Sequence, residues 1–315
     1  MRVLVTGSTG FVGHAACLSL SKRGFDVCAF SRGEFVWPHG IEPVVAPALS
    51  KLGVASSFLD EVDCILHLAG RAHILREKAV DSLGSFRQVN VSETLALARR
   101  AALAGVRRFI FVSSVKVNGE STSPFIPFTE ADTPCPVDPY GISKYEAELA
   151  LNQLGAETGM EIVIVRPPLI YGPRVKGNFR VMMNLLSRRV PLPLGSIRDN
   201  LRSLVSLDNL VDFLVFCISR GEAANRVFLV SDRRDVSTAE LLELLGSAMK
   251  VPVNLLPFPP YILDRISRLG PGRSLYQKLC GSLVVDASAA VRFLGWEPTL
   301  SLEEGLRRAA IGFTA

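Results

Sequence analysis

The chain has 315 residues, of which 48% are apolar, enough for a large hydrophobic core and two lobes that share one site. Its net charge of +5 comes from dispersed lysines and arginines, and no basic tract interleaved with aromatic residues suggests a nucleic-acid partner. The N-terminal apolar run is too short for a signal peptide, and Asp208 and Asp212 interrupt the longest apolar stretch. We therefore expect a cytoplasmic protein without a membrane span. Peripheral attachment to a membrane is left open.

The first half of the chain alternates short β-rich runs with helix-like segments. The expected strands are residues 2–6, 26–30, 43–46, 64–68, 108–112 and 161–166. The expected helices lie near residues 11–23, 80–104 and 140–158. Because continuous apolar strands alternating with helices are typical of a parallel sheet covered on both faces, residues 1–170 predict a doubly wound α/β domain.

The second half, after residues 166–173, has a looser pattern. The expected helices lie near residues 178–188, 208–219, 237–249 and 301–311, and the expected strands near 204–206 and 226–230. The sequence Ser-Thr-Ala-Glu at 237–240 is a capping box that opens one of these helices. Because these segments are too short to fold alone, residues 171–315 predict a smaller α+β substrate-binding lobe, with some segments returning to the first domain.

The six cysteines show no C-x-x-C pair and no metal-type spacing with the four histidines. They are Cys17, Cys28, Cys64, Cys135, Cys217 and Cys280. We therefore expect reduced thiols, mostly in the core, and no metal site.

A glycine-rich segment, VTGSTGFVG, follows the first strand and opens the first helix. Gly7, Gly10 and Gly13 permit a tight turn and a close approach of the backbone, and the helix N-terminus offers free N–H groups to a pyrophosphate. The pattern predicts a dinucleotide site of the Rossmann type. The remaining loop residues expected to contact the cofactor are Thr9, Phe11 and Val12.

The end of the second strand indicates which dinucleotide is bound. NAD-binding proteins usually place an acid there to hold the ribose 2′-hydroxyl, whereas this chain has Ser31 and Arg32, with Glu34 slightly later. A guanidinium and a hydroxyl suit a 2′-phosphate, which a carboxylate would repel. We therefore expect NADPH as the cofactor, with NAD or NADH as the alternative.

A tyrosine and a lysine lie one helical turn apart in DPYGISKYE, residues 138–146. Tyr140 and Lys144 share a helix face, and Ser114, after the fifth strand, is expected at the same edge of the sheet. We expect the Lys144 ammonium to lower the pKa of Tyr140, so that the phenol can exchange a proton with a substrate oxygen that Ser114 orients. Ser114, Tyr140 and Lys144 are therefore the expected catalytic residues.

These motifs together resemble the extended short-chain dehydrogenase/reductases, the branch of NAD-dependent epimerases, dehydratases and ketosugar reductases. The resemblance runs nearly end to end, through VTGSTGFVG, HLAG, NVSET, FVSSVKVNG, DPYGISK, RPPLIYGP and LGWEP. It implies that Asn90 supports the sheet and that further residues contact the cofactor, namely His67, Ala69, Gly70, Lys144, Pro167 and Leu169. It also implies a sugar-nucleotide pocket formed by Ser114, Lys116, Asn178, Phe179, Leu192, Pro193, Leu194 and Arg202, the last facing the diphosphate.

The family contains several chemistries, and dehydration is excluded. In the 4,6-dehydratases an Asp-Glu pair follows the serine or threonine, whereas Val115 and Lys116 follow Ser114 here. Epimerases use an arginine and an aspartate to bind the diphosphate, and this chain has KLCGSLVVD (278–286) in their place. The acidic residue that usually follows the third strand, near the adenine, is replaced by VAPAL (45–49). Both departures concern residues that would place the nucleotides.

The segments SSVKVNG and LCGSLVVD most resemble the UDP-4-keto-6-deoxy-N-acetylhexosamine 4-reductases of bacterial surface-polysaccharide synthesis, which are often named UDP-glucose 4-epimerases. The leading expectation is therefore NADPH-dependent reduction of a UDP-linked 4-ketosugar to the quinovosamine or fucosamine type. A UDP-hexose 4-epimerase with tightly bound NAD is the second interpretation, and a non-catalytic dinucleotide sensor the third. The family also leads us to expect a homodimer formed through residues 80–104 and 140–158.

Overall fold

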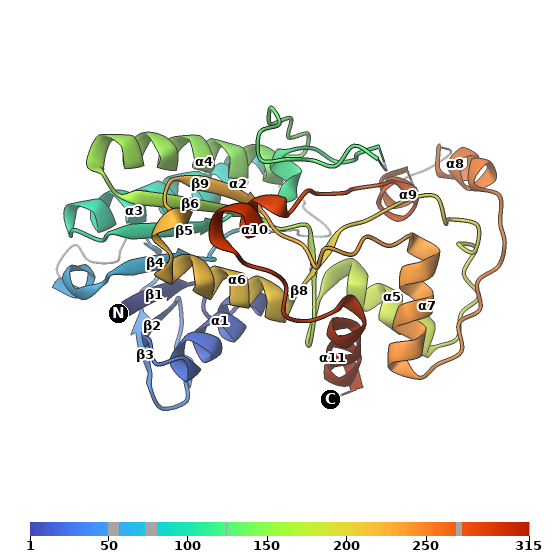
Figure 1. Cartoon of the computed structure of the whole chain (residues 1–315), viewed down its shortest axis with the longest axis horizontal. Helices are drawn as coiled ribbons and strands as arrows, with labels where there is room; N and C mark the ends of the chain where they lie inside the picture. The colour runs from blue at the N-terminus through green and yellow to red at the C-terminus, as the bar shows by residue number, and fades with distance from the viewer. Residues whose placement is uncertain (50–56, 73–80, 124, 269–272, 315) are drawn as a thin grey trace.

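Seven parallel strands form the centre of the molecule, in the order β3-β2-β1-β4-β5-β6-β9 (Figure 1). The computed structural model describes residues 1–49, 57–72, 81–123, 125–268 and 273–314. The strands are β1 (Arg2–Thr6), β2 (Asp26–Ser31), β3 (Ile41–Val45), β4 (Cys64–His67), β5 (Arg108–Val112), β6 (Glu161–Arg166) and β9 (Arg226–Leu229). The strand order reverses between β1 and β4, and doubly wound sheets bind their ligands at that point. The predicted α/β fold class is confirmed.

Helices cover both faces of this sheet and enclose two hydrophobic cores. On one face lie α1 (Phe11–Lys22), α6 (Leu207–Ser219) and α10 (Ser288–Leu294). On the other lie α3 (Thr94–Leu103) and α4 (Pro139–Thr158). Because the central strands β1, β4, β5 and β6 are buried on both sides, most of their residues form continuous apolar runs, whereas the edge strand β3 is partly exposed.

The helix expected over residues 80–104 is three elements. A short α2 (Ser82–Arg87) leads into a π-helical turn, η3 (Gln88–Glu93), before α3 begins. π-turns are often found at functional sites, and this one carries the buried Asn90. Short 3₁₀ turns lie at η2 (Ser57–Glu61), η4 (Val115–Val117) and η5 (Gly221–Ala223).

The smaller lobe has its own core. Its elements are the strand pair β7 (Leu169–Tyr171) and β8 (Leu204–Ser206) and the helices α5 (Gly177–Ser187), α7 (Thr238–Met249), α8 (Pro260–Arg268), α9 (Arg273–Cys280) and α11 (Leu302–Thr314). Ser237 caps α7 by accepting a hydrogen bond from the Glu240 N–H at 3.1 Å, as the capping pattern predicts. Strand β7 and helices α8, α9 and α10 were not predicted from the sequence.

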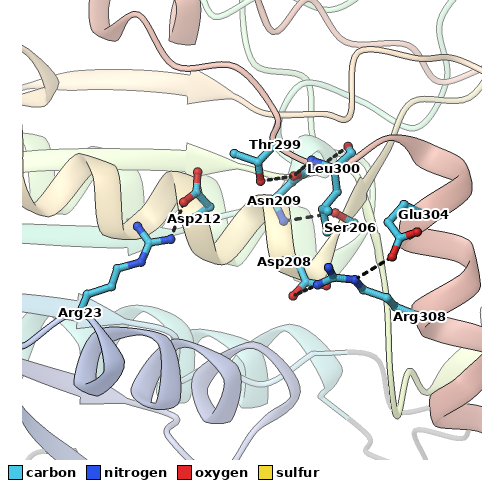
Figure 2. Close-up of polar contacts among 9 residues, drawn as sticks. All are labelled: Arg23, Ser206, Asp208, Asn209, Asp212, Thr299, Leu300, Glu304 and Arg308. Atoms are coloured by element: carbon cyan, nitrogen blue, oxygen red, sulfur yellow. Dashed lines mark hydrogen bonds and ion pairs between the residues drawn. The ribbon is translucent and has the colours of Figure 1, made fainter.

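Polar contacts made by α6 connect the two lobes (Figure 2). Asn209 accepts a hydrogen bond from the Leu300 N–H at 2.9 Å and donates to the Leu300 carbonyl at 2.9 Å. Arg308 of α11 lies 3.3 Å from Asp208, and Arg23 of α1 lies 2.5 Å from Asp212. Helix α6 is therefore tied to α1 on the sheet and to α11 in the smaller lobe.

A fully buried arginine donates hydrogen bonds to backbone carbonyls at the C-terminal end of α6. Arg108 donates to the carbonyls of Cys217 and Arg220 at 2.5 and 2.7 Å, and to Glu161 at 2.7 Å.

Arg108→Met should lower the free energy of unfolding by ~3 kcal/mol, because the buried carbonyls and the carboxylate lose their donor. Urea unfolding measures this loss. The exposed pair of Arg198 and Glu243 provides the control, and Arg198→Met should unfold close to the wild type.

Candidate active site

The glycine loop after β1 has a backbone path that only glycine permits. Gly7 has φ +66°, and a Cβ atom on it would lie 2.7 Å from the Ala69 nitrogen. A Cβ atom on Gly13 would lie 2.1 Å from the Gly7 oxygen. Ser8 fixes the loop to the end of β2 by donating to the Phe30 carbonyl at 2.7 Å. The loop and the first turn of α1 are thereby packed against each other as a dinucleotide site requires.

Helix α1 begins at this loop with a bare N-terminus. Gly10 is the N-cap, no side chain caps the helix, and no acidic residue lies in its first turn. The N–H groups of Phe11 and Val12 are thus available to an anion at the carboxyl edge of the sheet. This arrangement fits the pyrophosphate of a dinucleotide.

The end of β2 presents Arg32 rather than Ser31. Arg32 is exposed, whereas Ser31 is buried and donates its hydroxyl proton to the Gly33 carbonyl at 2.6 Å. A phosphate only accepts hydrogen bonds, so Ser31 would have to release this bond to contribute one. Arg32 is therefore the better placed of the two for a 2′-phosphate.

His67 at the end of β4 is a structural residue in this arrangement. Its ring is fully buried, with Nδ1 at 2.8 Å from the Thr6 hydroxyl and Nε2 at 2.9 Å from the Thr94 hydroxyl. Burial and the nearby Lys144 ammonium lower its pKa to about 3, so the imidazole is neutral. The expectation that the His67 side chain lines the cofactor channel does not fit this burial, whereas Gly70 is exposed, as a channel residue would be.

Asn90 in the π-turn joins the β4 loop to the helix that carries Tyr140. Its carboxamide accepts from the Arg71 N–H at 2.7 Å and donates to the Arg71 carbonyl at 3.1 Å and to the Ser143 hydroxyl at 2.9 Å. Ser143 in turn donates to the Tyr140 carbonyl at 2.8 Å. Asn90 therefore supports the site as well as the sheet.

Tyr140 and Ser114 are brought together by the start of α4 and the end of β5. Asp138 caps α4 by accepting from the Gly141 N–H at 2.6 Å, and Pro139 follows at the first helical position. Tyr140 and Ser114 are hydrogen-bonded to each other. Burial raises the pKa of Tyr140 to about 12, and the Ser114 bond only partly opposes this shift.

Lys144 does not act on Tyr140 as we expected from the sequence. Its ammonium donates to the Val112 carbonyl at 2.9 Å and lies 4.4 Å from the centre of the Phe111 ring. The interactions that shift the pKa of Tyr140 are its burial, Ser114 and Asp138. In this structure burial therefore outweighs the effects that favour the phenolate, and the pKa of Tyr140 lies above its ordinary value.

A buried ion pair lies one helical turn beyond Lys144. Glu148 accepts from Arg166 at 3.0 and 2.5 Å, and both side chains are almost fully buried. Arg166 also donates to Asn118 at 3.1 Å. Burial lowers the pKa of Lys144 to about 8, and the Glu148 carboxylate opposes this shift. We did not predict Glu148 from the sequence, although its spacing of four from Lys144 could have indicated it.

We expect the Glu148 carboxylate to affect the pH dependence of activity, because it stabilises the charged form of Lys144. If the charged ammonium is required, kcat/KM should fall as the pH rises through about 8. Glu148→Gln removes the charge that raises the pKa of Lys144, so the falling limb should move to lower pH. Glu146→Gln is the control, because Glu146 lies on the same helix in an exposed pair with Arg87. An unmoved limb in Glu148→Gln would contradict this role.

Lys116, an expected substrate residue, is engaged elsewhere. Its ammonium forms ion pairs with Asp138 and, at 2.9 Å, with Glu120. Burial alone would lower the pKa of Lys116, but the two carboxylates outweigh it and the pKa is raised. Lys116 therefore holds the N-terminus of α4, and the neighbouring Val115 is a core residue.

The other expected pocket residues differ in how accessible they are. Phe179 is fully buried and stacks on Tyr171, so its ring belongs to the core of the smaller lobe. Leu192 and Leu194 are also buried, whereas Asn178 and Pro193 are exposed. Of the two residues expected beside the nicotinamide, Pro167 is buried and Leu169 is exposed. Arg202 is half-buried and donates to the Gly281 carbonyl at 2.8 Å.

Comparison with known proteins shows the family of the chain. The model of the NAD dependent epimerase/dehydratase family matches residues 3–231. A UDP-glucose 4-epimerase from Vibrio cholerae is 42% identical over 99% of this chain and 95% of its own length. A GDP-6-deoxy-D-mannose reductase from Pseudomonas aeruginosa is 25% identical over 97% of this chain and 95% of its own length.

The fold is shared with a solved UDP-glucuronic acid 4-epimerase from Bacillus cereus in complex with UDP-glucuronic acid and NAD. The TM-score is 0.79 at 20% identity, and the match covers 100% of this chain and 99% of the other. The family match covers most of the chain, and the relative from Vibrio cholerae is similar over nearly the whole length of both proteins. The chain therefore belongs to the NAD dependent epimerase/dehydratase family.

Proposed function

We propose that the chain reduces the 4-keto group of a UDP-4-keto-6-deoxy-N-acetylhexosamine with NADPH, giving a UDP-6-deoxy sugar of the quinovosamine or fucosamine type. Surface-polysaccharide synthesis in the cytoplasm would use this product. The observation that carries the choice of a reductase is the exposed guanidinium of Arg32 directly after β2. A guanidinium there favours NADPH, which an enzyme uses once and releases.

Bound NADPH would supply the hydride that carbon 4 of the sugar receives. Tyr140 donates its phenolic proton to the oxygen on carbon 4, and Ser114, hydrogen-bonded to Tyr140, orients that oxygen. Lys144, held by the Val112 carbonyl, places a positive charge behind the site. A phenol whose pKa is about 12 begins in the protonated form that reduction requires.

Sugar binding belongs to the same proposal. We assign the guanidinium of Arg202 to the diphosphate, because it is a cation that can donate hydrogen bonds to phosphate oxygens. The backbone of Arg202 is held in place by β-bridges to Val236 and Leu283. The exposed Asn178 and Pro193 supply further contacts from the smaller lobe. The buried Phe179, Leu192 and Leu194 support the pocket from within the core.

Epimerisation of a UDP-hexose is the second candidate. It is favoured by the name of the Vibrio cholerae relative, which is 42% identical to this chain. An epimerase keeps its NAD and would use Tyr140 first as a base and then as an acid. A non-catalytic sensor is the third candidate, but it does not account for the retained Ser114, Tyr140 and Lys144.

The assay that tests the proposal uses purified protein, NADPH and freshly made UDP-4-keto-6-deoxy-N-acetylglucosamine. Loss of reduced-nicotinamide absorbance, clearly slower with NADH, is the expected result. Interconversion of UDP-hexoses without net loss of NADPH would support the epimerase instead. No turnover with either substrate, together with tight NADPH binding, would support the sensor.

A homodimer through α3 and α4 is also proposed. Leu103 and Leu149 are apolar side chains on these helices with 88% and 52% of their surface exposed. A helix pair that exposes leucines in this way suits contact with a second copy. Sedimentation velocity should show a dimer, and a monomer at micromolar concentration would contradict the proposal.

A further inference from the structure

Lysines and arginines are dispersed along the chain, but one segment lacks the acidic residues that balance them elsewhere. Residues 162–198 contain seven lysines and arginines and no aspartate or glutamate. The whole chain carries a net charge of only +5, so the remainder is slightly acidic. Five of the seven bases lie on or beside α5, namely Arg174, Lys176, Arg180, Arg188 and Arg189.

These five residues, which we call the α5 basic face, point to solvent. The opposite side of α5 buries Phe179, Met183 and Leu186 in the core of the smaller lobe. Arg180 lies within α5, whereas Arg174 and Lys176 precede the helix and Arg188 and Arg189 follow it. All five bases are exposed. Figure 1 shows α5 in the smaller lobe beside α7, at the opposite end of the molecule from α3.

The α5 basic face has no acidic partner among the residues that the structure describes. Arg180 lies 5.7 Å from the centre of the Phe313 ring, and the other four side chains form no ion pair there. Elsewhere arginines are regularly paired, as Arg87 is with Glu146 and Arg292 with Glu130. The surface of α5 is therefore an uncompensated positive patch.

Helix stability explains only part of this arrangement. Arg174 and Lys176 precede α5, at the end where the helix dipole is positive and a cation is unfavourable. Arg188 and Arg189 follow α5, at the end where the dipole favours a cation. The two bases before the helix are therefore not explained by its stability, and a basic surface without acidic partners suits a ligand of opposite charge.

We propose that the α5 basic face binds the surface of an anionic lipid bilayer and holds the protein reversibly at the membrane. Between the bases, Val181 and Val190 expose 51% and 36% of their surface, so the face combines charge with aliphatic groups that can enter the headgroup region. The long arginine side chains can lie along such a surface while their charged ends reach the phosphates.

Lipid is favoured over a nucleic acid by the shape and composition of this face. Residues 174–190 present a helix ridge with exposed valines, and no aromatic ring on it is exposed for base stacking. No helix among the described residues is long and apolar enough to cross a membrane. The attachment is accordingly peripheral and electrostatic, and it does not depend on which sugar the enzyme reduces.

Sedimentation of the full-length protein with vesicles tests this proposal. At ~0.1 M salt the protein should sediment with phosphatidylglycerol-containing vesicles and stay in solution with pure phosphatidylcholine. Arg188→Gln/Arg189→Gln should weaken binding about thirtyfold, because each base near an anionic surface contributes ~1 kcal/mol and ~1.4 kcal/mol corresponds to tenfold. Neither residue belongs to the proposed site, so NADPH-dependent turnover should be unchanged.

The matched control is Arg99→Gln/Arg107→Gln, which removes two exposed bases at the other end of the molecule. It should bind the anionic vesicles as the wild type does. Equal weakening by both double variants would show a response to net charge alone and overturn the proposal. Failure of the wild type to bind anionic vesicles would also overturn it, as would tighter binding of single-stranded RNA that is lost in Arg188→Gln/Arg189→Gln.

Discussion

Replacing Tyr140 with phenylalanine should lower kcat with the 4-ketosugar by about 10²–10⁴-fold, the range typical of losing a positioned general acid. The phenolic proton is the one we assign to the substrate oxygen, and Ser114 alone cannot supply it because its hydroxyl is the orienting group. Steady-state kinetics at neutral pH measures this loss. NADPH binding, followed by fluorescence, should stay within about twofold, since the glycine loop and Arg32 are unchanged.

The control for this variant is Tyr145→Phe. Tyr145 lies on the same helix, five residues after Tyr140, and is not part of the proposed site. It should turn over like the wild type. If Tyr140→Phe retained most of its kcat, the proton would have to come from elsewhere and the assigned role of Tyr140 would be wrong.

Replacing Arg32 with alanine should raise the KM for NADPH by about 10–100-fold and leave the KM for NADH nearly unchanged. Hydrogen bonds to a charged group contribute about 1.5–3 kcal/mol, and only NADPH carries the 2′-phosphate that would receive them. Ser31 should compensate little, because its hydroxyl is already donated to Gly33. Initial rates with both cofactors give the two values.

Lys22→Ala is the matched control for Arg32, since it removes an exposed cation at the end of α1. It should leave both KM values unchanged. An equal loss with NADH and NADPH in Arg32→Ala would contradict recognition of the 2′-phosphate. It would also remove the main support for a dissociable NADPH, and hence for a reductase.

The elements that position the site were predictable because their signals are local. Four of the strands, β1, β5, β6 and β8, have the bounds expected from the sequence. Gly7 and Gly13 could be recognised from spacing, since the steric demand on each depends on the turn that the glycines themselves form. Helix α4 was equally clear, with its Asp138 cap and Pro139 at the first position.

Features that depend on the tertiary environment could not be predicted in the same way. The pKa of Tyr140 depends on its burial and on its bond to Ser114, and neither follows from the spacing of four between Tyr140 and Lys144. The motif predicts a channel residue at His67 because it does not report that Thr6 and Thr94 occupy both ring nitrogens. The pair of Glu148 and Arg166 joins a helix to a strand, so only the fold brings it together.

Hydride transfer from NADPH to carbon 4 of the sugar is tested most directly with NADPH that carries deuterium at both positions of nicotinamide carbon 4. After reaction with UDP-4-keto-6-deoxy-N-acetylglucosamine, mass spectrometry and NMR of the product would locate the label. If the chain reduces the 4-keto group, each product molecule should carry one deuterium on carbon 4, and one NADPH should be consumed for each sugar reduced. A product without deuterium, or UDP-hexoses interconverted while the labelled NADPH stays intact, would contradict it.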